Sequence, residues 1–274
     1  MEPDRRAPVR RVSLPAGIDH NPRMPEPSRA AVLIFTRGPA AEGARKRLQH
    51  RGGADLLGTV FETVLAEASA CRAGVIVAAP EGARLPALPP AAGRIRQEGS
   101  GSADRLERAI ADGFARGVER LVVIGDDAPE IRSDDLEMAL QATSRPVPTA
   151  VVGPCRDGGF YLLALNRPAP EALRGIPWGS RRTLAELRRR LRAGGFELLT
   201  LRTLADVDDR AGVQRFGART LRHARPRLRA LGARIAAWVR AVCAWAAPLT
   251  ARLPRQLVAH LLPSRAPPSP AQSL

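Results

Sequence analysis

Cysteine is scarce in this chain of 274 residues, and its three cysteines lie far apart. Cys71, Cys155 and Cys243 are separated by more than eighty residues each and form no C-x-x-C pair. An odd number of distant cysteines indicates neither a disulfide framework nor a cysteine-ligated zinc site. We therefore expect a protein of a reducing compartment, the cytoplasm.

Acidic residues are absent from the last quarter of the chain. Residues 211–274 hold eleven Arg and no Asp or Glu, whereas residues 31–210 hold 26 basic and 23 acidic side chains. The formal net charge of +16 thus belongs mainly to the end of the chain. A nearly neutral central part argues against an enzyme that acts on nucleic acid, and we expect no specific nucleic-acid binding.

Long apolar runs are missing at both ends. Residues 1–30 are rich in Pro and Arg and lack the apolar region of a signal peptide. The apolar residues beyond position 217 are interrupted by arginines and fall short of the roughly 20 apolar residues that span a bilayer. We divide the chain into a disordered lead (1–30), a folded domain (31–216) and an Arg-rich amphipathic helical tail (217–274).

Two common catalytic signatures are also missing. The sequence contains neither G-x-S-x-G nor H-E-x-x-H, and its four histidines are scattered. Serine-hydrolase and zinc-protease functions are therefore excluded.

Short apolar runs alternate with helical patterns from residue 31 onward. Continuous runs of this kind are typical of strands buried on both faces of a parallel sheet, and the alternation with helices indicates βαβ units. We predict an α/β fold with three layers and a mostly parallel sheet. The strand-like runs are 31–35, 74–79, 120–125, 149–153, 160–165 and 196–201, and the helical patterns are 56–70, 104–116, 133–142, with Ser133 as N-cap, and 181–192.

The loop after the first strand, residues 36–48, is the first place where a ligand could bind, because doubly wound sheets bind ligands at the carboxyl ends of their strands. We expect an irregular glycine-containing loop that approaches a phosphate, next to the cations Arg45, Lys46 and Arg47. The alternative is a solvated basic loop.

Carboxylates follow three later strands. Asp126 and Asp127 end the run 120–125 where a divalent cation would find hard oxygen ligands, or they only cap a turn. Asp157 precedes Gly158 and Gly159 on a tight turn, which is either part of a site or a plain hairpin. Among the acids of 206–209, one is either a further metal ligand or a helix N-cap.

The order of these pieces resembles a bacterial family of GT-A-like transferases of largely unknown function. Some members are described as radical-SAM/selenodomain-associated transferases or arsenosugar-biosynthesis glycosyltransferases. The resemblance covers about residues 31–216 and rests on five segments, which are the first-strand loop, GDDAP, GPCRDGGFYLL, IPWGSRRTL and DVDD. Trp178 is followed by Gly179 and Ser180 where the family has Ser-Thr, a departure that concerns the acceptor side.

This resemblance implies the GT-A fold of the nucleotide-diphospho-sugar transferases. It implies a divalent metal, Mg²⁺ or Mn²⁺, on the diphosphate of a nucleotide-sugar donor. Catalysis or substrate positioning would fall to Asp157. The metal ligands would be Asp127 with Asp206 or Asp208, and the donor-binding residues would be Arg37, Lys46, Arg47, Gly158 and Gly159.

Three functions stay open from the sequence. The leading hypothesis is a metal-dependent glycosyltransferase. The second is a nucleotidyltransferase that joins an NTP to a phosphorylated small molecule, and the third is an inactive GT-A-like binding module.

The C-terminal tail carries Leu231, Ile235, Trp238, Val242 and Trp245 on one helical stripe. One interpretation is a helix on an anionic membrane surface, peripheral to the inner face of the membrane. The alternative is a helix that packs against the domain or a second copy.

Overall fold

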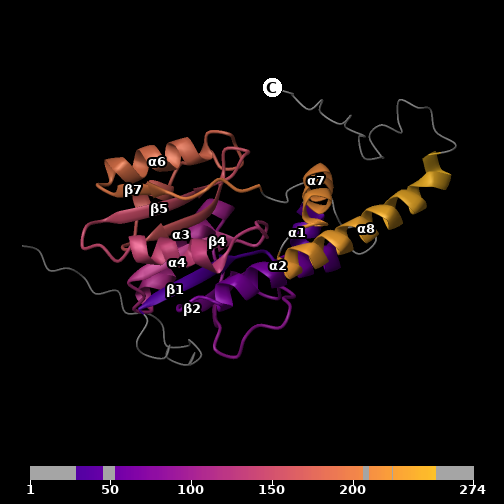
Figure 1. Ribbon diagram of the computed structural model, residues 1–274. Coiled ribbons are helices and arrows are strands. Elements are labelled where there is room, and N and C mark those ends of the chain that lie inside the picture. The colour runs from indigo at the N-terminus through magenta and orange to yellow at the C-terminus, as the bar shows by residue number, and fades with distance from the viewer. Residues whose placement is uncertain (1–28, 46–52, 206–209, 224, 251–274) are drawn as a thin grey trace, which may run out of the picture.

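The computed structural model describes residues 29–45, 53–205, 210–223 and 225–250 (Figure 1). Its centre is a seven-stranded sheet in the order β3-β2-β1-β4-β6-β5-β7. Among the strands of these residues, β6 alone runs antiparallel to its neighbours. The strands are β1 (Ala30–Phe35), β2 (Gly74–Ala79), β3 (Gly93–Arg96), β4 (Arg120–Gly125), β5 (Thr149–Pro154), β6 (Phe160–Leu165) and β7 (Glu197–Thr200).

Helices cover both faces of this sheet. One core packs α2 and α4 against it, and the other packs α3, α5 and α6. The predicted α/β fold with three layers and a mostly parallel sheet is therefore confirmed. The helices are α1 (Pro39–Arg45), α2 (Gly53–Ser69), α3 (Ser102–Ala115), α4 (Ser133–Ala142), α5 (Pro170–Leu173), α6 (Thr183–Ala193), α7 (Arg210–Thr220) and α8 (Pro226–Thr250).

The apolar strands supply both cores at once. In β1, Val32 and Ile34 point into one core, whereas Ala31 and Leu33 point into the other, as the two-residue period of a strand requires. The runs predicted at 74–79, 120–125 and 160–165 coincide with β2, β4 and β6. The sequence did not predict β3, because only Ile95 of its four residues is buried.

Two local predictions were wrong. The stretch 36–48 was expected to be irregular, but α1 occupies Pro39–Arg45, since proline suits the first helical position and the Glu42 N–H donates to the Gly38 carbonyl at 3.0 Å. Ser133 is not an N-cap, because it is the first residue of α4 and Arg132 is the N-cap. Acids supply the missing acceptors: the Ser133 N–H donates to Glu67 at 2.9 Å and the Arg132 N–H donates to Asp135 at 2.9 Å.

The last two helices form a hairpin beside α2 (Figure 1). The α8 side chains Leu231, Ile235, Trp238 and Val242 are buried in a third core. Of the two interpretations of the stripe, packing against the domain is therefore the one observed for these four residues. The third core also contains Val213 and Phe216 of α7 and Leu56, Leu57 and Val60 of α2.

No helix among the described residues is long and apolar enough to cross a membrane. The proposed boundary between residues 216 and 217 falls inside α7. Contact of residues 217–274 with anionic lipid stays a prediction, and it would have to rest on exposed arginines such as Arg234 and Arg240.

Candidate functional site

The strand order reverses at β1, which pairs with β2 on one side and β4 on the other. In open α/β sheets such a switch point marks the crevice at the carboxyl ends of the strands where ligands bind. A hydrogen bond crosses it here, because the hydroxyl of Thr36, directly after β1, donates to the carboxylate of Asp126, directly after β4. The acidic pair predicted from the sequence thus lies at the centre of this edge.

The segment after β1 forms a tight turn against its neighbours. The Gly38 N–H donates to the Thr36 hydroxyl oxygen at 2.8 Å, and Gly38 has a φ of +87°. A Cβ at Gly38 would lie 3.3 Å from the carbonyl oxygen of Arg84, so glycine suits both the backbone and the space. Arg37 leaves this turn and donates to the hydroxyl of Ser102 at the start of α3. Its guanidinium is therefore held at the carboxyl edge.

The segment after β4 brings the second acid back over the strand end. A Cβ at Gly125 would lie 2.8 Å from Oδ1 of Asp127, so this carboxylate occupies the space that a side chain at residue 125 would need. Asp126 and Asp127 are both partly exposed to solvent. Two carboxylates at one turn provide the hard oxygen donors that Mg²⁺ and Mn²⁺ prefer.

The Asp157–Gly159 segment is the hairpin that joins β5 to β6. The Cys155 N–H donates to the Gly159 carbonyl at 3.0 Å, and the Gly159 N–H donates to Oδ1 of Asp157 at 2.8 Å. Of the two interpretations of this turn, the backbone has the conformation of a hairpin. Asp157 is nevertheless exposed at the same edge as the acidic pair, since β5 runs parallel to β4.

Gly158 fixes how this hairpin meets α6. Its φ is +94°, and a Cβ there would lie 2.4 Å from the carbonyl oxygen of Arg181. The Gly158 carbonyl accepts from the N–H of Leu184 at 3.0 Å. Only glycine fits this contact, so Gly158 fixes the hairpin that carries Asp157 against the start of α6.

Tyr161 supports the hairpin from inside the sheet. Its ring lies against Gly153, where an added Cβ would be 2.4 Å from the ring, and its hydroxyl donates to the carbonyl of Arg202 at 3.1 Å. Burial raises the pKa of this phenol above its ordinary range, and the carboxylate of Asp135 adds to the shift. Tyr161 therefore stays neutral and acts as a fixed donor.

Sequence reasoning missed Gln97 as part of this edge. Gln97 directly follows β3, is 7% exposed, and donates through Nε2 to the carbonyls of Thr36 and Ala78 at 2.8 and 2.9 Å. It therefore ties the ends of β1 and β2 together. No signal in the sequence marks Gln97, because β3 itself was not predicted.

Two buried side-chain polar atoms among the described residues have no hydrogen-bond partner, Gln97 Oε1 and Trp178 Nε1. Trp178 stands beside Phe160, with ring centroids 6.0 Å apart. The segment predicted to concern the acceptor side thus packs on the first residue of β6.

Four predicted site residues, Lys46, Arg47, Asp206 and Asp208, lie outside the described residues. Within the described part of the chain, no group of three or more potential ligands is arranged for a metal ion. Leu204, which precedes the acidic stretch 206–209, bridges to Cys155 at the carboxyl end of β5. Of the acids predicted from the sequence, the described residues at this edge are Asp126, Asp127 and Asp157.

The chain is similar to known proteins in sequence and in structure. Residues 61–180 match a family described as "Uncharacterized protein conserved in bacteria (DUF2064)". This segment contains GDDAP, the Asp157–Gly159 hairpin and Trp178, but not the first-strand loop or DVDD. No protein with a curated function matches the chain.

Among solved structures, one similar protein is described as a "putative nucleotide-diphospho-sugar transferase" from Desulfovibrio desulfuricans G20. It is 24% identical, covers 78% of this chain and 97% of its own, and superposes with a TM-score of 0.68. This likeness shows that the fold is that of the nucleotide-diphospho-sugar transferases, as predicted.

More distant structures have lower TM-scores. A cytidylyltransferase from Leptospira borgpetersenii is 11% identical, covers 73% of this chain and 90% of its own, and has a TM-score of 0.46. The mannosyltransferase PcManGT from Pyrobaculum calidifontis, in complex with GDP-Man and Mn²⁺, is 16% identical, covers 89% of this chain and 86% of its own, and has a TM-score of 0.43.

The sequence match and the fold match both point the same way as the resemblance drawn from the sequence motifs. Within residues 61–180 the chain is similar to the bacterial family DUF2064.

Proposed function

We propose that this protein is a metal-dependent transferase that uses a nucleotide-linked donor, and specifically a glycosyltransferase with a nucleotide-sugar donor. The observation that carries the proposal is the Thr36–Asp126 hydrogen bond at the switch point, with Asp127 beside it. Acids at this place in this fold are positioned where the diphosphate of a bound nucleotide would meet a cation.

Asp127, with Asp206 or Asp208, would hold the divalent metal. A bound Mg²⁺ or Mn²⁺ would neutralise the diphosphate as its bond to the sugar breaks. Asp126 would keep Asp127 in place, since its own carboxylate is engaged by the hydroxyl of Thr36. The chemistry of these donors fits a hard cation.

The cationic residues would bind the donor phosphates. Arg37, held by Ser102 and 3.8 Å from Glu42, would present its remaining N–H groups at the carboxyl edge. Lys46 and Arg47 would add charge from the segment after α1. This preorganised positive charge would stabilise the leaving diphosphate.

The β5–β6 hairpin would serve the other substrate. Asp157 would orient the acceptor or take its proton, because its carboxylate is exposed at the edge of the site. Gly158 and Gly159 would let the backbone approach the ligand closely.

A panel of candidate donors tests the proposal on the full chain. UDP-, GDP-, CDP- and dTDP-sugars and free NTPs are titrated with and without Mg²⁺ or Mn²⁺, and the released product is identified. Metal-dependent binding of one nucleotide sugar, with release of a nucleoside diphosphate in the presence of an acceptor, supports the glycosyltransferase. Preference for an NTP with release of pyrophosphate would replace it by a nucleotidyltransferase. If the folded chain binds none of these compounds, both transferase functions are contradicted. The inactive GT-A-like module is then the function that is left.

A further inference from the structure

Residues 128–131 form a turn that directly follows the acidic pair Asp126 and Asp127. Ala128 and Ile131 are both 1% exposed and belong to the core, and the Ile131 N–H donates to the Ala128 carbonyl at 3.1 Å. The carbonyls of Glu130 and Ile131 leave this turn without a helix or strand to pair with. Backbone carbonyls beside the core that pair with no neighbouring helix or strand need hydrogen-bond partners from elsewhere in the fold.

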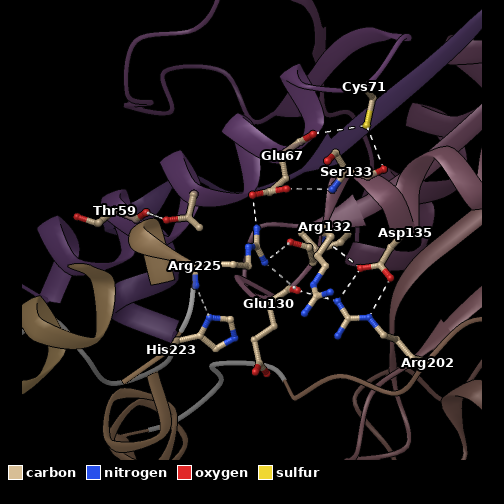
Figure 2. Close-up of polar contacts among 12 residues, drawn as sticks. Thr59, Glu67, Cys71, Glu130, Arg132, Ser133, Asp135, Arg202, His223 and Arg225 are labelled. Atoms are coloured by element: carbon tan, nitrogen blue, oxygen red, sulfur yellow. Dashed lines mark hydrogen bonds and ion pairs between the residues drawn. The ribbon is translucent and has the colours of Figure 1, made fainter. Parts of the chain in front are cut away.

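Two arginines from the chain after β7, Arg202 and Arg225, supply those partners (Figure 2). Arg202 donates through Nη2 to the Glu130 carbonyl at 2.9 Å. Arg225 donates through Nη1 to the carbonyls of Ile131 at 3.3 Å and Glu130 at 3.5 Å. Arg219 of α7 donates to the Glu130 carboxylate at 2.7 Å.

Arg202 and Arg225 also form ion pairs with acids on two helices (Figure 2). Arg225 forms an ion pair with Glu67 of α2. Arg202 forms a two-pronged ion pair with Asp135 of α4, with N–O distances of 2.9 and 2.7 Å. A guanidinium that binds both oxygens of a carboxylate is held in one preferred geometry.

These acids also hold the beginning of α4. Glu67 accepts from the N–H of Ser133 and Asp135 accepts from the N–H of Arg132. Their side chains are 13% and 3% exposed, so water competes little for them. The turn and the start of α4 are therefore held by one connected network that runs from Glu67 of α2 to Arg225, the residue before α8.

Arg225 is more deeply buried than Arg202 and Arg219, because its side chain is 22% exposed and theirs are 41% and 43% exposed. Arg219 and Glu130 meet with the arginine 43% exposed, a setting in which an ion pair adds little. Arg225 is 22% exposed and reaches three acceptors at once. Arg225 is therefore the strongest single tie between the C-terminal hairpin and the turn.

We propose that Arg225, with Arg202, is a positioning residue for the Asp126–Asp127 turn, and that the α7–α8 hairpin is thereby part of the transferase site. The role in metal binding rests on the proposed function. The arginines touch neither metal nor substrate. They act through the backbone of residues 128–131, which leads directly from Asp127.

The test uses the full chain and two readouts. Hydrogen–deuterium exchange of the peptide that contains residues 126–131 reports order in the turn, and electron paramagnetic resonance with Mn²⁺ alone as the probe reports metal affinity. Both are measured at a temperature where circular dichroism shows every variant folded. The matched control is Arg234→Gln, an exposed arginine of α8, the helix that follows Arg225.

In Arg225→Gln we expect faster exchange in the turn and a Mn²⁺ affinity about tenfold weaker, the size of loss seen when groups that orient metal ligands are removed. Arg234→Gln should match the wild type in both. If Arg225→Gln does not fold, Arg225→Lys replaces it. Its ammonium can keep the ion pair with Glu67 but cannot donate to Glu67 and both carbonyls in one geometry.

Unchanged exchange in the turn would overturn the proposal, and so would faster exchange with unchanged Mn²⁺ affinity in a chain that binds Mn²⁺. If the wild type binds no Mn²⁺ and Asp127→Asn changes nothing, the metal-dependent function fails instead. The exchange result then decides by itself whether Arg225 positions the turn.

Discussion

The guanidinium of Arg225 donates to the carboxylate of Glu67, which lies 158 positions earlier in the chain. This contact joins the loop before α8 to α2, while the third core joins the apolar faces of the same helices. The C-terminal hairpin is therefore packed onto the nucleotide-diphospho-sugar transferase fold by both charge and burial.

Removal of this ion pair should destabilise the whole chain. Arg225→Gln leaves the carboxylate of Glu67, which is 13% exposed, without its charged partner, and we expect a loss of about 3 kcal/mol in the free energy of unfolding. Urea denaturation followed by circular dichroism measures it. Arg234→Gln on the exposed face of α8 should change the unfolding free energy by less than about 0.5 kcal/mol. Equal losses of unfolding free energy in Arg225→Gln and Arg234→Gln would show that the Arg225–Glu67 ion pair does not stabilise the fold.

The β5–β6 hairpin should tolerate no side chain at Gly158. In Gly158→Ala, a Cβ 2.4 Å from the Arg181 carbonyl adds a clash to the strain of a φ of +94°. We expect a loss of about 2 kcal/mol or more. Gly179→Ala is the matched control, because Gly179 has a φ of +71° but open space around its Cβ position. Its cost should be that of strain alone, about 1 kcal/mol, and similar melting curves for the two variants would refute the contact.

Much of the fold could be predicted because it depends on local patterns. The runs VLIF, GVIVAA and RLVVIG are buried on both sides of the sheet, and continuous apolar character shows this directly in the sequence. The acids at the carboxyl edge could be predicted for the same reason, since Asp126 stands directly beyond such a run and Asp157 follows another by three residues. Because strands that are connected through helices run parallel, their carboxyl ends and the acids that follow them lie at the same edge of the sheet.

What could not be predicted depends on contacts distant in sequence. The chain has 42 arginines and a single lysine, so nothing in the sequence distinguishes Arg202 and Arg225 from the arginines that face solvent. The partners, Glu67 and Asp135, lie on helices whose acids look like ordinary surface residues. Gln97 is similar, because its role lies in two carbonyls supplied by β1 and β2.

Cys71 should be unreactive in the folded protein. Its thiol is 8% exposed and donates to the carbonyls of Glu67 at 3.5 Å and Ser133 at 3.6 Å. Burial, with smaller effects of the carboxylates of Glu137, Glu67 and Asp134, raises the pKa of this thiol from 9.0 to about 12. At pH 8 the thiolate should be about a thousandfold rarer than in the unfolded chain.

Alkylation by iodoacetamide, followed by mass spectrometry of the Cys71 peptide, checks this in buffer and in urea. Because the pKa is higher in the folded state, the thiol's contribution to stability is complete below pH 9 and is lost as the pH rises from 9.0 toward about 12. Equal labelling rates in buffer and urea at pH 8 would show that the thiol is accessible and contradict the burial.

The hydroxyl of Thr36 should matter more than its methyl group. Thr36→Val removes the donor to Asp126 and the acceptor for the Gly38 N–H, whereas Thr36→Ser keeps both. We expect metal-dependent nucleotide binding about tenfold weaker in the valine variant, because the acidic pair loses its tie to β1. Calorimetric titration of both variants measures the effect. Equal affinities for Val and Ser would show that the hydrogen bond across the switch point has no role in binding.

The most direct measurement is a calorimetric titration of the full chain and of Asp127→Asn with nucleotide sugars in the presence and absence of Mn²⁺. Asp134→Asn, an exposed acid on α4, is the control. We predict that the wild type and Asp134→Asn bind one nucleotide sugar only when Mn²⁺ is present, and that Asp127→Asn loses this binding while it remains folded. Metal-dependent binding that survives in Asp127→Asn, or its absence in the wild type, would contradict the assignment of this edge as a metal-dependent transferase site.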